Sequence, residues 1–116
     1  MIVFSLTGGI TAQDSELTLD PDGAALAVVH GYRSTGRVAA GELEAIVSEL
    51  DASGLFTGDP GTGERTYGPP WGFDLQRYSI TYRGATVVAY DTTVPSELVR
   101  VIALLQNALR GVQLGR

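Results

Sequence analysis

The sequence offers few side chains whose types and spacing could carry out chemistry. Its only histidine, His30, lies between Val29 and Gly31 in a strand-like segment. It is either a general base or metal ligand, or an ordinary histidine of a sheet surface, and the second interpretation is favoured. A metal site needs further ligands, and no group of His, Asp or Glu at ligand spacing accompanies it. The chain has no cysteine, so thiol chemistry and disulfides are excluded.

Two other segments superficially resemble ligand-binding loops. Residues 20–23 read Asp-Pro-Asp-Gly, which lacks the remaining ligands of a calcium loop and has the chemistry of a tight turn. Residues 58–63 are rich in glycine, but they lack the Lys-Ser/Thr ending of a phosphate-binding loop and follow a predicted helix. No serine occurs in a nucleophile-elbow context. We therefore predict no catalytic residues, no bound zinc or calcium, no cofactor and no hydrolase activity.

The segment 67–73 places three aromatic residues, Tyr67, Trp71 and Phe73, among glycine and proline. Trp and Tyr dominate the binding energy of many protein interfaces, so the segment is a candidate recognition surface. The alternative is that Trp71 and Phe73 close one end of the core and hold the loop in place. Both interpretations stand, with the structural one favoured for Phe73 because it leads directly into a strand.

The composition indicates a globular protein and argues against some classes of partner. A chain of 116 residues with 44% hydrophobic and 18% charged residues is typical of one globular domain, residues 1–116. A net charge of −5, with arginines scattered along the chain, argues against nucleic acid or an anionic membrane as partner. No apolar segment is long enough to span a bilayer, and we expect a cytoplasmic protein. The sequence does not indicate an oligomeric state.

The C-terminal third predicts a hairpin followed by a helix. Strands 75–83 and 85–91 alternate apolar and polar residues around Arg83-Gly84, so that Ile80 faces Val87 on an apolar face. Helix 95–110 begins at Pro95 and has one apolar stripe, with Gly111 as its predicted stop. This stripe is expected to cover the apolar face of the hairpin.

The remaining elements complete an α+β fold. Strands are predicted over 1–7, 15–20 and 24–32, with a possible short edge strand over 32–38, and a helix over 41–53 that ends at Gly54. Residues 57–74 form a long loop rich in Gly and Pro, of a kind that often has a function. We expect an antiparallel sheet of about five strands in the order βββαββα, with both helices on one face. A mixed sheet would have its parallel pair where the N-terminal strand meets the C-terminal hairpin.

Several of these features together resemble the emfourin family of small proteins that inhibit protealysin-type, thermolysin-like metallopeptidases. The similar elements are the strand that closes in residues 7–9, the helix 42–50 with its ending at 52–56, the segment 73–82 and the Val94-Pro95 start of the last helix. They follow one another in family order over nearly the whole chain. Two segments, 22–37 and 58–70, are longer than in a minimal family member, and since inhibitors act through loops this bears on the choice of target.

The resemblance implies a stoichiometric inhibitor that blocks the cleft of a thermolysin-like metallopeptidase. It implies that the first contact segment is residues 7–10, Thr7, Gly8, Gly9 and Ile10, where the two glycines allow the backbone to approach a partner closely. Tyr67 and Trp71 of the long loop are the second candidate, because rigid aromatic side chains give contact area at low entropic cost. The alternative function is a non-catalytic binding or structural module with an unknown partner.

Overall fold

The computed structural model describes residues 1–8, 13–56, 64–67, 76–90 and 94–113. These residues form seven strands and two helices. The strands are β1 (Ile2–Gly8), β2 (Gln13–Leu19), β3 (Ala24–Val29), β4 (Tyr32–Arg37), β5 (Glu64–Tyr67), β6 (Gln76–Tyr82) and β7 (Ala85–Tyr90). The helices are α1 (Ala40–Ser53) and α2 (Ser96–Gln113).

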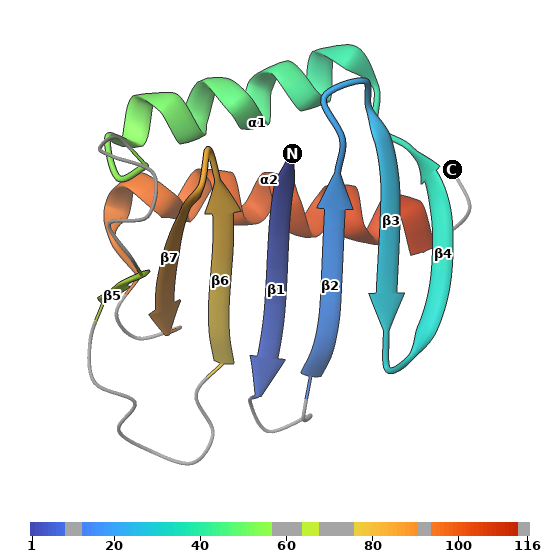
Figure 1. Cartoon of the computed structure of the whole chain (residues 1–116), viewed down its shortest axis with the longest axis horizontal. Helices are drawn as coiled ribbons and strands as arrows, with labels where there is room; N and C mark the ends of the chain where they lie inside the picture. Colours follow the sequence, from blue (N-terminus) through green and yellow to red (C-terminus); the bar gives the residue numbers. More distant parts are fainter. Residues whose placement is uncertain (9–12, 57–63, 68–75, 91–93, 114–116) are drawn as a thin grey trace.

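All seven strands belong to one sheet, in the order β4-β3-β2-β1-β6-β7-β5. Every neighbouring pair is antiparallel except β5 and β7, which run parallel. Figure 1 shows α2 lying behind the sheet and α1 running along its upper edge. The α+β class, the two helices and the largely antiparallel sheet are as predicted, although two more strands are present than expected.

The core lies between the sheet and the helices. Alternate residues of the strands point to this side, as in β1, where Ile2, Phe4 and Leu6 are buried while the residues between them are half-buried. Both helices contribute to the same core, α1 with the fully buried Ile46 and Leu50. The opposite face of the sheet, here called the open face, carries mostly small polar and charged side chains.

The C-terminal hairpin has the predicted register. Ile80 pairs with Val87 and Tyr82 with Ala85, and the Ile80 side of the hairpin is buried in the core. On the open face, the hydroxyl oxygens of Thr81 and Thr86 lie 2.9 Å apart. Arg83 and Gly84 both have positive φ, 54° and 79°, as a two-residue hairpin turn of the favoured type requires.

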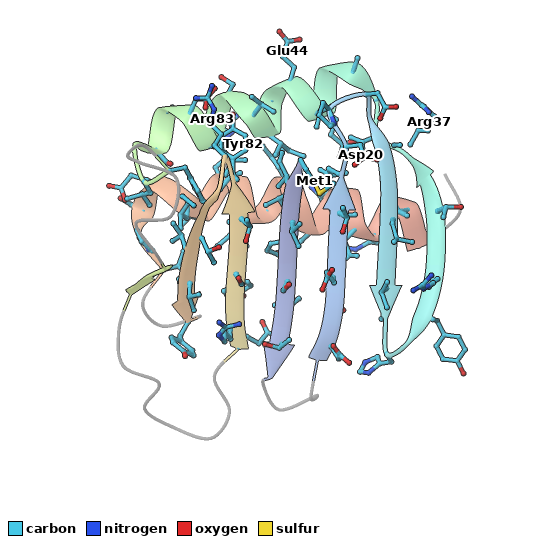
Figure 2. The ribbon with its side chains drawn as sticks, in the orientation of Figure 1. Met1, Asp20, Arg37, Glu44, Tyr82 and Arg83 are labelled. Carbon is cyan, nitrogen blue, oxygen red and sulfur yellow. The ribbon has the colours of Figure 1, made fainter. Side chains whose placement is uncertain are left out.

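The end of α1 is tied to this turn. Gly54 takes the predicted left-handed cap at φ 70°, and the following Phe56 is buried against Tyr82 in an edge-to-face contact with ring centroids 5.8 Å apart. The Tyr82 hydroxyl donates a 2.8 Å hydrogen bond to Asp51 Oδ1, and Arg83 lies 3.7 Å from the same oxygen. Figure 2 shows Tyr82 and Arg83 at the end of β6 beneath α1.

Burial, followed by the hydrogen bond to Asp51 and the charge of that carboxylate, raises the pKa of Tyr82 above its ordinary value of 10.0. The Arg83 guanidinium acts in the opposite direction, and it also lies 5.8 Å from the centre of the Tyr82 ring. Tyr82 is therefore held neutral in the folded protein at pH values at which an exposed tyrosine begins to ionise.

Four expectations need correction. Strand 24–32 is interrupted, because His30 and Gly31 form a turn between β3 and β4. The parallel pair is β5–β7, whereas β1 meets the C-terminal hairpin in antiparallel orientation. β5 lies within the predicted long loop 57–74, whose other residues, 57–63 and 68–74, lie outside the described part of the chain. Gly111 does not end α2, because the added turn buries Val112, which offsets the poor helix propensity of glycine.

The two-faced pattern of β6 gives a direct test of the core. Ile80→Asp forces an unpaired charge into the core and is expected to lower the free energy of unfolding by about 4 kcal/mol. Ser79→Asp, one residue earlier on the open face, is the matched control and should cost about 1 kcal/mol or less. Urea denaturation of both variants measures the difference. Equal losses would show that the two faces of β6 are not distinct.

Tyr82→Phe tests the connection between α1 and the hairpin turn. At neutral pH the variant should lose about 1 kcal/mol of stability, because the hydrogen bond to Asp51 is removed while the ring is kept. Since the folded-state pKa of Tyr82 is raised, this advantage of the wild type is complete below pH 10.0 and declines as the pH rises above it. Urea denaturation at several pH values measures it. Tyr32→Phe, at an 80% exposed position, is the control, and a similar loss there would contradict this account.

Candidate interaction edge of the sheet

The first predicted contact segment begins at the end of β1. Thr7 lies opposite Asp14 of β2 and Arg77 of β6, and Gly8 lies opposite Gln13 and Gln76. Gly8 has a φ of 81°, which a residue with a side chain adopts only with strain, so the chain needs glycine where it leaves the sheet. The other two residues of the segment, Gly9 and Ile10, lie outside the described residues.

The second predicted segment begins at the same edge of the sheet. Tyr67, the last residue of β5, pairs with Ala89 of β7. Ala89 pairs in turn with Tyr78 of β6, and Tyr78 pairs with Leu6 of β1, so these four residues lie in one row across the sheet. Tyr67 and β1 are three strands apart, a backbone separation of about 14 Å. Trp71 and Phe73 lie outside the described residues, so the choice between recognition surface and core plug stays open. The structure thus brings Thr7, Gly8 and Tyr67 to one edge.

We call this end of the sheet the Thr7 edge, defined by Thr7, Gly8, Asp14, the His30-Gly31 turn and Arg77. In Figure 1 the corresponding ends of β1 and β2 and the β3–β4 turn lie together at the lower edge, opposite α1. Its charges alternate across the open face, since Thr7 stands between the carboxylate of Asp14 and the guanidinium of Arg77. The Cβ atoms of residues directly opposite one another on neighbouring strands are about 5 Å apart, so Thr7 has a residue of each charge on the strands beside it.

The structure adds residues that the sequence analysis did not assign to this edge. His30 is exposed and has a φ of 49°, and its backbone N–H donates a 2.8 Å hydrogen bond to the backbone carbonyl oxygen of Asp14. Tyr32, which follows the His30-Gly31 turn, is 80% exposed, and this is unusual for an aromatic residue on a strand. A residue followed by Gly between two alternating segments is a hairpin signal, so the turn was readable from the sequence. The favoured interpretation of His30, an ordinary surface histidine, agrees with its exposure.

A hollow lies at the other end of the sheet. Its volume is about 760 Å³, and it is lined by the β2–β3 turn, the end of β4 and the first half of α1. Arg37 donates a 2.9 Å hydrogen bond from Nη2 to the carbonyl oxygen of Asp22, which holds this guanidinium at the rim. Figure 2 shows Asp20, Arg37 and Glu44 at this end. Residues 20–23 form the predicted turn, with Gly23 at φ 94°. Neither Thr7 nor Gly8 lines the hollow.

Within the described part of the chain, no three or more His, Cys, Asp or Glu side chains are grouped so that they could hold a metal ion. Neither α1 nor α2, the helices of the described residues, is long and apolar enough to cross a membrane. The sequence matches no protein-family model and no curated protein. A proposal for the function therefore rests on the geometry of the Thr7 edge and on the resemblance of the sequence to the emfourin family.

His30 offers a test of how this edge is built. An Asn-Gly pair is the preferred sequence for a turn with two positive φ values, so His30→Asn should raise the free energy of unfolding by about 0.5 kcal/mol. Thermal or urea denaturation measures the change, with His30→Ala as the comparison, because alanine has no such preference and should destabilise the turn. A loss of stability in His30→Asn would mean that the imidazole makes contacts that outweigh the backbone strain.

Proposed function

We propose that this protein is a non-catalytic inhibitor of thermolysin-like metallopeptidases and that it binds the peptidase with the Thr7 edge. The observation that carries the proposal is that the described residues of the two candidate segments, Thr7 and Gly8 of the first and Tyr67 of the second, lie at the same end of the sheet. Thr7 and Tyr67 are far apart in the chain, yet the register of one continuous sheet places them at the same end. The family resemblance supplies the class of target.

A rigid support favours this mode of action. β1 is hydrogen-bonded to β2 on one side and to β6 on the other over its whole length, and its inner face is buried. Thr7 and Gly8 are therefore held in place by the sheet before binding, and little of their ordering entropy remains to be lost. An inhibitor that is already ordered can block a cleft stoichiometrically without covalent chemistry.

The size and charge of the molecule suit such a complex. The chain measures 36 × 34 × 23 Å, so one end of the sheet with its adjoining segments can supply the roughly 800 Å² per partner of a standard interface. The net charge of −5 favours attraction to a peptidase whose cleft rim is basic, and this affects the rate of association more than the affinity. Asp14 and Arg77, which have opposite charges, then set the orientation at the contact.

The proposal is tested by titrating the purified protein into a thermolysin-like peptidase and following hydrolysis of a peptide substrate. The wild type should abolish activity at a one-to-one ratio. Thr7→Arg should weaken inhibition at least tenfold, by about 1.4 kcal/mol, because it places a long charged side chain at the centre of the Thr7 edge. Thr7 is preferred to Gly8 for this change, because the positive φ of Gly8 would strain any replacement.

Thr18→Arg is the matched control. Thr18 is a half-buried threonine on the same open face, but it lies toward the opposite end of β2. It should fold and inhibit like the wild type.

Trp71→Ala tests the second segment in parallel. If the wild type does not inhibit, the protein is a binding or structural module with another partner. If it inhibits and Thr7→Arg inhibits equally, the Thr7 edge is not the contact surface.

A further inference from the structure

The strand β4 is an edge strand with an accessible side. Among the described strands it has one neighbour, β3, and it ends the sheet on the side opposite β5. Of its six residues, four are exposed and two are intermediate, Ser34 and Gly36. An edge of this kind presents unpaired backbone N–H and C=O groups to which another strand can be added.

The hydrogen-bonding pattern identifies these groups. β3 and β4 are antiparallel, with Val29 paired to Tyr32 beside the turn, and beyond the last pair at the other end, Ala24 with Arg37, the Val38 N–H donates to the carbonyl oxygen of Gly23. Because hydrogen-bonded pairs alternate along an antiparallel ladder, Tyr32, Ser34 and Gly36 bond to β3. The N–H and C=O groups of Arg33, Thr35 and Arg37 consequently point away from the sheet.

These same three residues place their side chains on the open face, and two of them are positively charged. Arg33 lies opposite Val28, and Arg37 lies opposite Ala24, so neither faces a carboxylate on β3. The nearest acidic residue in the row of Arg33 is Glu16 on β2, two strands or about 10 Å away. The edge therefore combines free backbone groups with two guanidinium groups four residues apart.

A second copy of the chain is a poor occupant of this edge in the register that pairs residues 33–37 of the two copies with each other. Antiparallel pairing of two β4 strands centred on Thr35 would set Arg33 of each copy opposite Arg37 of the other, and like charges directly opposite destabilise a sheet. We propose instead that β4 binds an extended acidic segment of a partner protein, with two carboxylates four residues apart. This segment would add an eighth strand and place its carboxylates opposite Arg33 and Arg37.

The proposal does not rest on peptidase inhibition, because the backbone groups and arginines that carry it belong to β4, which contributes none of the residues that define the Thr7 edge. The exposed ring of Tyr32 stands at the start of β4, on the side of the sheet opposite Arg33, and extends the contact beyond the backbone. Arg37 is held by its hydrogen bond to the Asp22 carbonyl, which fixes the position of one of the two charges.

The test uses two capped synthetic peptides of six residues, the length of β4. One carries two glutamates four positions apart and serine and threonine elsewhere, and the other has lysine in place of each glutamate. Amide hydrogen exchange of the isotopically labelled protein is followed by NMR. With the glutamate peptide, the amides of Arg33, Thr35 and Arg37 should become protected, whereas Ser34 and Gly36 should be protected with or without it.

Arg33→Glu is the test variant, and it should weaken binding of the glutamate peptide about tenfold. Arg110→Glu makes the same charge change at an exposed position of α2 and should leave binding unchanged. The proposal is overturned if the glutamate peptide protects none of the three amides or if the lysine peptide protects them equally well. Concentration-dependent protection without peptide would also overturn it, because a second copy would then be the occupant.

Discussion

The fold depends on the burial of one face of β1 while both of its edges are hydrogen-bonded. Ile2, Phe4 and Leu6 pack into the core, and their neighbours in the chain face the other side of the sheet. Because side chains alternate along a strand, a shift of one residue against β2 or β6 would turn all three out of the core. The burial of β1 thus sets the register of the meander β2–β4 on one side and of the C-terminal hairpin on the other.

The sequence predicted the elements that local patterns determine. The hairpin β6–β7, the cap at Gly54 and the turn at residues 20–23 follow from alternation and from turn chemistry, and all three are present. β5 could not be predicted in the same way. It has four residues between segments rich in glycine and proline, and it exists because it pairs in parallel with β7, a contact that no local pattern encodes.

The candidate site shows the same division. Thr7, Gly8 and Tyr67 were named from residue type and resemblance, but their meeting at one edge results from strand order, which connects β1 to β5 through β6 and β7. The contribution of His30 was missed for a different reason. The alternation of β3 was extended through His30 and Gly31, although the His-Gly pair is itself a turn signal, and the strand therefore ends at Val29.

A sheet covered by helices on one side has two functional consequences. The core face and the hairpin turn beneath α1 are fixed by packing and by the hydrogen bond between Tyr82 and Asp51. The Thr7 edge is the end remote from α1, where the strand ends are held by the sheet (Figure 1). The two surfaces proposed for binding are accordingly an end and an edge of the sheet.

The most direct measurement is an NMR map of the labelled protein in complex with an inactivated thermolysin-like peptidase. The account predicts that the amides of Thr7, Gly8, Asp14 and His30 show the largest changes in chemical shift and the strongest new protection from hydrogen exchange. Amides near Asp51 and Arg83, at the end beneath α1, should be unaffected. Changes confined to that end, or no complex at all, would contradict the proposed role of the Thr7 edge.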